Sequence, residues 1–144
     1  MKNLKIALGC DHGGYELKNS VGEFLKKEGY DFRDFGCFSK DSVDYPVIAK
    51  EIANLVAKGE FDRGIIICGS GLGVAIAANK VKGIRAVTCQ DTYCAKMSRA
   101  HNDANVMTMG GRVIDVPTAE DIVKIWLETD FEGGRHQRRI DMIE

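Results

Sequence analysis

The sequence predicts an α/β fold, a three-layer α/β/α sandwich with a five-stranded parallel sheet of the Rossmann/flavodoxin-like kind. Short apolar runs alternate along the chain with segments of helical periodicity, as in repeated strand–helix–strand units. Runs that are apolar throughout are typical of strands covered by helices on both faces. The 16 glycines in 144 residues gather just after these runs, where an open sheet turns into its helices.

Three strands are expected in the first half of the chain, at residues 4–8, 30–35 and 63–68. A helix joins the first two, because apolar side chains recur there at helical spacing: Leu17, Val21, Phe24 and Leu25. A second helix is expected over residues 44–58, with Pro46 in its first turn, where the missing N–H costs no hydrogen bond.

The second half continues the same alternation. Helices are expected at residues 74–80, 92–100 and 118–129, and strands at residues 85–89 and 105–109. Residues 1–131 therefore form a single α/β domain. The segment 132–144 differs in composition, with two glycines, then basic residues, then two isoleucines, and we treat it as a separate basic tail.

Composition excludes several classes of protein. The apolar fraction of 44% and charged fraction of 28% are ordinary for a globular domain. The net charge of −1 gives no general attraction to nucleic acid or to an anionic membrane. The opening residues contain no long apolar run, so we expect neither a secretion signal nor a membrane span. Five cysteines without zinc-ribbon spacing indicate reduced thiols in the cytoplasm.

One end of the predicted sheet is expected to bind a ligand. Ligands of open α/β sheets bind at the carboxyl ends of the strands, and chemically active residues gather there: Asp11, His12, Cys68, Ser70 and Arg112. Cys68 ends the third strand, and glycines at 69, 71 and 73 then lead into a helix of small residues. Backbone N–H groups at such a turn favour negative charge on a phosphate, an oxyanion or a thiolate.

Other readings of these residues are weaker. The glycine spacing is not G-x-G-x-x-G and follows the third strand, so it is weak support for a dinucleotide site. A phospho-receiver module needs an aspartate where Cys68 stands. Cys10 and His12 are too few ligands to close a metal site without a second cluster.

Several candidates have a plain structural alternative. Cys68 could be a small buried hydrophobe, as Cys10, Cys89 and Cys94 are expected to be. His101 could simply interact with the end of a helix. The tail arginines could be solvated, although Arg135 and Arg139 stand four apart and would form a fork for a phosphate on one helical face. The sequence by itself leaves His101 and the tail open.

Seven motifs, in this order and over nearly the whole chain, resemble the B-type ribose-5-phosphate isomerases. They are CDHGG (10–14), DYP (44–46), ICGSGLG (67–73), AANK (77–80), GIRA (83–86), SRAHNDAN (98–105) and EGGRHQ (132–137). The resemblance implies interconversion of D-ribose 5-phosphate and D-ribulose 5-phosphate through an enediolate, a pentose phosphate pathway reaction that needs no metal or organic cofactor. It also implies a homodimer with shared active sites, in some members paired into a tetramer.

The broader family includes allose- and galactose-6-phosphate isomerases, so a hexose-6-phosphate isomerase is the alternative within the enzyme class. The alternative from another class is a phosphate-binding regulatory module without catalysis. Such a module would bind anions but would not exchange a substrate C–H with solvent.

The resemblance also implies roles for individual residues. Cys68 accepts the proton, Ser70 helps move protons between the two oxygens, and main-chain N–H groups form the anion hole: those of Gly69, Ser70, Gly71, Leu72 and Gly73. Some relatives lack the cysteine and use a glutamate just after the glycine loop. Here that position is Val74, which favours Cys68.

The remaining roles concern ring opening and binding. By resemblance, His101 donates the proton that opens the furanose, with Asp11 nearby. The groups that hold the phosphate are His12, Arg112, Arg135 and Arg139, and those that hold the sugar are Asn102 and Tyr45.

Strand geometry predicts that these residues come from two subunits. His101 precedes the fifth strand, at the amino end of the sheet, whereas Cys68 ends the third strand. A five-residue strand spans roughly 17 Å, too far for both side chains of one subunit to meet one sugar. We therefore expect His101 and Asn102 to come from the neighbouring subunit, with the 132–144 tail packed on that partner.

Overall fold

Five parallel strands form a single sheet in the order β2-β1-β3-β5-β4. The computed structural model describes residues 3–144, so the first two residues of the predicted 1–131 domain lie outside the described residues. The strands are β1 (Lys5–Cys10), β2 (Asp31–Asp34), β3 (Arg63–Cys68), β4 (Ala86–Thr88) and β5 (Val106–Gly110). The predicted fold class, with five parallel strands between helical layers, is confirmed.

The last two strands are exchanged relative to the flavodoxin order 2-1-3-4-5. Burial explains the exchange. Every residue of β5 is buried, as an interior strand requires, whereas β4 has three residues of which two are half-buried, as suits an edge. β5 therefore pairs with β3 on one side and β4 on the other.

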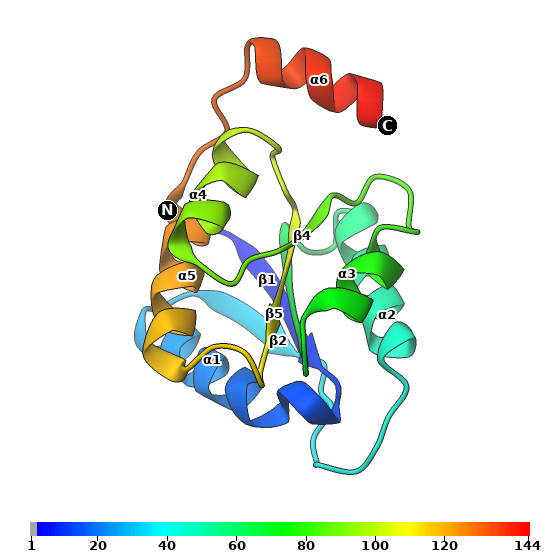
Figure 1. The fold of residues 1–144 in the computed structure, drawn as a ribbon, viewed down its shortest axis with the longest axis vertical. Helices are drawn as coiled ribbons and strands as arrows, with labels where there is room; N and C mark the ends of the chain where they lie inside the picture. The colour runs from blue at the N-terminus through cyan, green and yellow to red at the C-terminus, as the bar shows by residue number, and fades with distance from the viewer. Residues whose placement is uncertain (1–2) are drawn as a thin grey trace.

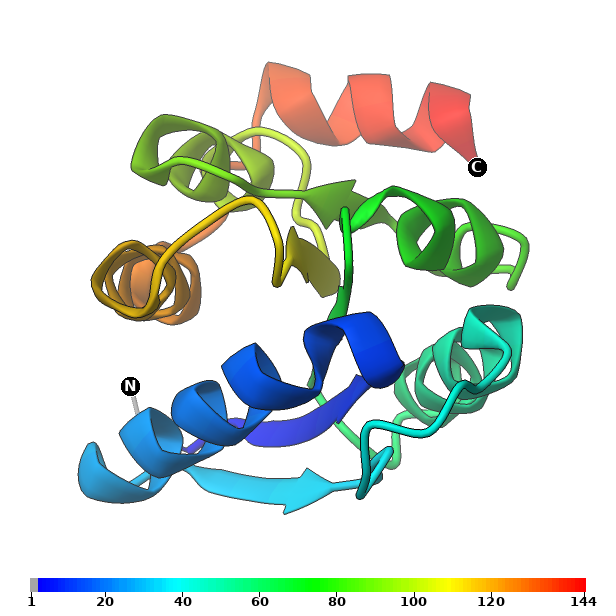
Figure 2. The same cartoon turned by 60° about the horizontal axis from the view of Figure 1, so that its bottom comes forward.

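Helices cover both faces of the sheet. α1 (Tyr15–Lys27), α4 (Thr92–Ala100) and α5 (Val116–Glu128) lie on one face, and α2 (Tyr45–Ala57) and α3 (Leu72–Ala78) on the other (Figure 1). A short 3₁₀ turn, η1 (His12–Gly14), leads from β1 into α1. Figure 2 shows the sheet between these two layers. None of the helices within residues 3–144 is long and apolar enough to cross a membrane.

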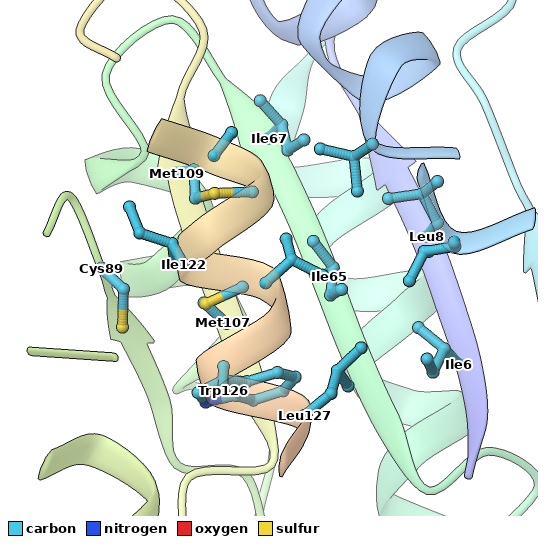
Figure 3. Packing of buried hydrophobic residues seen from close by; sticks show 14 of the residues in the cluster. Ile6, Leu8, Ile65, Ile67, Cys89, Met107, Met109, Ile122, Trp126 and Leu127 are labelled. Carbon is cyan, nitrogen blue, oxygen red and sulfur yellow. The ribbon is translucent and has the colours of Figure 1, made fainter. Parts of the chain in front are cut away.

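The core lies on both sides of β3. Ile65 and Ile67 point toward α5 and pack with its Ile122 and Trp126 (Figure 3). Ile66 points to the opposite face and packs among the residues of α2 and α3. This alternation follows from the two-residue period of a strand, and both faces are apolar because both are covered.

Element boundaries follow local capping. β3 and α4 have the predicted bounds, whereas α3 begins at Leu72, two residues earlier than expected, because Gly71 turns the chain with a φ of 81°. α5 begins at Val116 because the Asp115 carboxylate accepts the N–H of Thr118 and caps the first turn.

The tail forms the helix α6 (Arg135–Ile143), which lies beyond the amino ends of the strands (Figure 1). Its two buried side chains, His136 and Ile140, are four residues apart and hold one face of the helix against the domain. Arg135 and Arg139 are exposed. The two basic residues thus share one helix, at the opposite end of the sheet from Cys68.

Candidate active site

The carboxyl end of β3 lies at a topological switch point. β3 runs between β1 and β5, and the chain leaves both neighbours toward the face covered by α1 and α5 (Figure 1). It leaves β3 toward the opposite face, into α3. Chains that leave adjacent strands in opposite directions separate there and open a crevice, which is where open α/β sheets bind their ligands.

A cavity of ≈ 520 Å³ occupies this crevice. Its lining combines residues from four segments of the chain: Asp11, Tyr45, Cys68, Gly69, Ser70, Gly73, Arg112 and Val113. Most of the predicted site residues at the carboxyl end of the sheet are thereby brought together. His12 lines the neighbouring cavity instead, and Gly71 and Leu72 are not part of the lining.

Cys68 forms part of this cavity wall although it is only 5% exposed. The N–H of Gly71 donates to the Cys68 Sγ at 3.0 Å. The sulfur is therefore not sealed in the core; it lies in a cavity bordered by the same glycine loop whose amide faces it. A thiol at the base of a cavity, with an N–H donor directed at it, can act as a nucleophile or a base.

Side chains from β4 and β5 hold the glycine loop in place. The hydroxyls of Thr88 and Thr108 lie 3.0 Å and 2.6 Å from the Gly71 carbonyl oxygen, to which both donate. The Gln90 side chain donates to the Ser70 carbonyl at 2.7 Å and accepts the Gly110 N–H at 3.1 Å. Sequence reasoning missed these residues, although Thr108 is a polar residue in an otherwise apolar strand.

Asp11 is fixed by the turn that follows it. One carboxylate oxygen accepts the N–H groups of Gly13 and Gly14, at 2.9 Å and 3.2 Å, and so caps η1. The loops after β1 and β3 touch here: a Cβ added to Gly13 would lie 2.9 Å from the Gly69 nitrogen. Asp11 therefore borders the Cys68 cavity from the β1 side, in a fixed orientation.

Arg112 connects this cavity to a second one. Its guanidinium lies over Gly69, where an added Cβ would be 3.0 Å from Nη1. The second cavity, of ≈ 320 Å³, is lined by Arg112, His12 and Lys40 among others. His12 Nδ1 accepts the Val43 N–H at 3.2 Å, so Nε2 carries the ring proton and is a donor. Lys40 is paired with Glu16, which lines the same cavity, so Arg112 and His12 are the donors that suit an anion such as a phosphate.

The other predicted site residues lie at the amino end of the sheet. His101 ends α4, and its ring stacks on that of His136 with centroids 4.2 Å apart. The Asn102 carbonyl accepts a hydrogen bond from Arg85 Nε at 2.9 Å. Within one chain the structure therefore divides the predicted residues into two groups at opposite ends of the sheet.

The other cysteines have surroundings unlike those of Cys68. Burial and the neighbouring Cys37 raise the pKa of Cys10, whose Sγ lies 3.7 Å from that of Cys37. Burial raises the pKa of Cys89 to about 11. The expectation that Cys94 fills the core is wrong: it is exposed on the first turn of α4, where Asp91 caps the helix.

The sequence of this chain matches a known protein family and individual relatives in it. Residues 6–143 match the sequence profile of the Ribose/Galactose Isomerase family. The chain is 49% identical to ribose-5-phosphate isomerase B of Escherichia coli over 139 residues, which is 96% of this chain and 93% of the relative.

Solved structures agree with the sequence relatives. Ribose-5-phosphate isomerase B of Clostridium thermocellum superposes with a TM-score of 0.96 at 54% identity, covering 97% of this chain and 95% of that one. Ribose-5-phosphate isomerase B of Mycoplasma genitalium with bound ribulose-5-phosphate superposes with a TM-score of 0.94 at 40% identity, covering 99% and 95%. Both similarities extend over almost the full length of each chain.

Proposed function

The chain belongs to the ribose/galactose isomerase family, and we propose that it is an aldose–ketose isomerase that interconverts D-ribose 5-phosphate and D-ribulose 5-phosphate. One observation carries the proposal: the Cys68 thiol lies in a cavity beside a loop of main-chain N–H groups, with Arg112 and His12 next to it. The similar Mycoplasma genitalium protein, whose structure contains ribulose-5-phosphate, supports a sugar phosphate as the ligand.

The reaction begins with removal of the C2 proton from the open-chain aldose. This proton is acidic because the charge left behind is shared with the C1 carbonyl oxygen. The Cys68 thiolate accepts it, which leaves an enediolate with its negative charge on O1. Ser70 relays the O2 proton to O1, and the Cys68 thiol then returns its proton to C1, which gives the C2 ketone.

The glycine loop supplies the stabilisation that this intermediate requires. Its N–H groups are fixed in direction because Thr88, Thr108 and Gln90 hold the loop carbonyls from behind. Each fixed donor to a developing oxyanion is worth about 3–4 kcal/mol of barrier height. A positioned base contributes a further factor of about 10²–10⁴.

Substrate orientation is assigned to the remaining groups around the two cavities. Arg112 borders both of them, so it can hold a phosphate while the sugar carbons extend toward Cys68. His12 supports the phosphate through its Nε2 proton, and Tyr45 lines the sugar side. Asp11 faces the sugar from the β1 loop.

Ring opening is assigned to a second subunit, and we propose a homodimer with shared active sites. Ribose 5-phosphate is mostly a closed furanose. His101 of the neighbouring subunit protonates the ring oxygen as the C1–O4 bond breaks, and the anomeric hydroxyl gives its proton to Asp11, which leaves the C1 aldehyde. Asn102, Arg135 and Arg139 approach with His101. Exposed apolar side chains on α3, at Leu72 (58%) and Ile76 (64%), support burial against a second copy of the chain.

Comparing three sugars under identical conditions tests the assignment. We expect the highest kcat/KM with D-ribose 5-phosphate, compared with the 6-phosphates of allose and galactose, and exchange of substrate C–H with solvent deuterium. Cys68→Ala should lower turnover about 10²–10⁴-fold, whereas Cys94→Ser, at an exposed thiol, should not. Faster turnover of a hexose phosphate would reassign the substrate. Phosphate binding without any exchange would identify a non-catalytic module.

A further inference from the structure

Two imidazoles and a carboxylate meet at the amino end of the sheet, away from the Cys68 cavity. They belong to His101 at the end of α4, Glu132 in the segment before α6, and His136 in the first turn of α6. The Glu132 Oε1 lies 3.4 Å from His136 Nε2 and 3.8 Å from His101 Nε2. All three ligand atoms lie within 4.8 Å of one another.

The His136 Nε2 has no hydrogen-bond partner although its residue is only 6% exposed. The nearby Glu132 oxygen is close, but not in hydrogen-bonding geometry. Buried polar atoms are nearly always partnered, so a buried ring nitrogen left open toward a carboxylate and a second imidazole indicates a missing ligand.

The spacing of these atoms is close to that of a metal site. Tetrahedral zinc, with bonds of about 2.0–2.2 Å, places its ligand atoms about 3.3–3.6 Å apart. The separations of 3.4 Å and 3.8 Å from Glu132 are near this range. The two rings are stacked, with centroids 4.2 Å apart and planes 11° from parallel, so their in-plane Nε2 lone pairs do not meet in this arrangement. The His101 side chain is 39% exposed, and its ring must rotate out of the stack to share a metal with the buried His136. Glu132, with a half-exposed side chain, can follow them.

We propose that His101, Glu132 and His136 form a site for a divalent transition metal such as Zn²⁺, with a fourth position open to water. Two imidazole nitrogens and one carboxylate oxygen are a donor set that zinc accepts, and three protein ligands plus an open position is one of its common arrangements. The site joins the α4 end to the first turn of α6, so a bound metal also fastens the tail helix to the domain.

Occupation of this site inhibits the enzyme, a consequence that rests on the function proposed above. The metal takes the Nε2 lone pair of His101, so this nitrogen carries no proton for the furanose ring oxygen. Ribulose 5-phosphate cannot form a five-membered ring, because its C5 hydroxyl is phosphorylated. The metal should therefore slow conversion of ribose 5-phosphate far more than conversion of ribulose 5-phosphate.

Titration with Zn²⁺ and Co²⁺ tests the site itself. We expect one equivalent to bind the wild-type protein by calorimetry, with the visible absorption of four-coordinate cobalt. His136→Gln should lose this site while keeping every cysteine, and His12→Gln, which changes the only histidine outside the cluster, should retain it. Glu132→Gln, at an exposed carboxylate, serves as a second ligand variant if His136→Gln fails to fold.

Two binding outcomes would overturn the inference: no stoichiometric binding by the wild-type protein, or equal binding by folded His136→Gln, which would mean that thiols hold the metal. A separate assay tests the consequence. Added Zn²⁺ should inhibit the wild type with ribose 5-phosphate but not Glu132→Gln. Metal binding with undiminished turnover of ribose 5-phosphate would contradict the ring-opening role of His101. It would not contradict the metal site itself.

Discussion

Cys10 and Cys68 end neighbouring parallel strands, yet their surroundings give the two thiols different chemistry. Cys10 is fully buried against Cys37, and burial together with that neighbour raises its pKa. Cys68 instead receives a main-chain N–H and lines the cavity that Asp11 and Arg112 border, whereas Cys10 and Cys37 lie along a separate cavity. Sequence shows that both residues end apolar strands; only the packing of the following loops decides which sulfur a ligand can reach.

Alkylation should reveal this difference. Iodoacetamide near neutral pH should modify Cys68 and stop turnover, while Cys10 and Cys89 remain unmodified because burial raises their pKa values, that of Cys89 to about 11. Ribose 5-phosphate should protect Cys68. Peptide mass spectrometry in a Cys94→Ser background measures the labelling without the exposed thiol. Undiminished turnover after complete labelling of Cys68 would remove it from the role of base.

The residues that hold the glycine loop in place, such as Thr108 and Gln90, could not be identified from the sequence. Thr108 and Gly71 are 37 positions apart, and Gln90 joins Ser70 to Gly110 over 20 positions in each direction. Hydrogen bonds of this kind depend on the order of strands in the sheet. The residues to which we assign the chemistry could be located at the carboxyl end of the sheet because motif and strand end coincide, whereas those that hold the loop could not.

At the scale of elements, the junction between β3 and α3 is constrained both by its backbone conformation and by close packing. Gly71 has a φ of 81°, and a Cβ at this position would lie 2.7 Å from the Met109 carbonyl carbon. Gly83 has a similar φ of 90° but open space around it. The two positions therefore separate the cost of the backbone conformation from the cost of steric overlap.

Substitution at both glycines should measure these costs. Gly83→Ala should lower the free energy of unfolding by about 1–2 kcal/mol, the cost of a left-handed conformation. Gly71→Ala should lower the free energy of unfolding by this amount and by a further contribution of about 1–3 kcal/mol from overpacking. It should also lower kcat, because the loop moves away from Cys68. Denaturant unfolding and isomerase assays on both variants provide the comparison. Equal stability losses would show that the β3–α3 turn can relax around a methyl group.

Most elements, but not their arrangement, were predictable from periodicity. All five strands and the helices between them were expected, and β3 and α4 with correct bounds. The exchange of β4 and β5 was not, because nothing local in residues 85–89 marks a short edge strand. The sequence did not decide whether the tail is a helix or a solvated segment, because only two of its positions, His136 and Ile140, face inward with an apolar or aromatic side chain.

At the scale of the whole molecule, the proposed active site is divided between the two ends of the sheet. Cys68 and Arg112 lie at the carboxyl end, and His101 and the tail arginines at the amino end. One chain by itself therefore holds two incomplete half-sites, and we expect catalysis to require the dimer.

Hybrid dimers test this expectation. Cys68→Ala and His101→Ala proteins should each retain about a hundredth of wild-type activity or less, but their mixture should recover roughly a quarter of it, because half of the dimers are hybrids with one intact site of two. Native mass spectrometry confirms that hybrids form. Hybrids without activity would show that both residues serve the same subunit.

Chelation tests the metal-free chemistry. In the proposed mechanism, a thiolate base is the proton acceptor and main-chain donors stabilise the oxyanion, so EDTA-treated protein should keep its full turnover of ribose 5-phosphate. If the protein is purified with zinc bound to His101, Glu132 and His136, EDTA should increase its turnover of ribose 5-phosphate. A loss of activity that only added metal restores would contradict this mechanism.

The place of β5 between β3 and β4 also affects how the polypeptide matures during synthesis. The first three strands can pair as soon as they leave the ribosome, but β4 finds no neighbour until residues 106–110 arrive. Until then the nascent chain presents an unpaired apolar β3 edge, which is a template for aggregation. Truncated products that stop before β5 should therefore be substrates for chaperones and proteases.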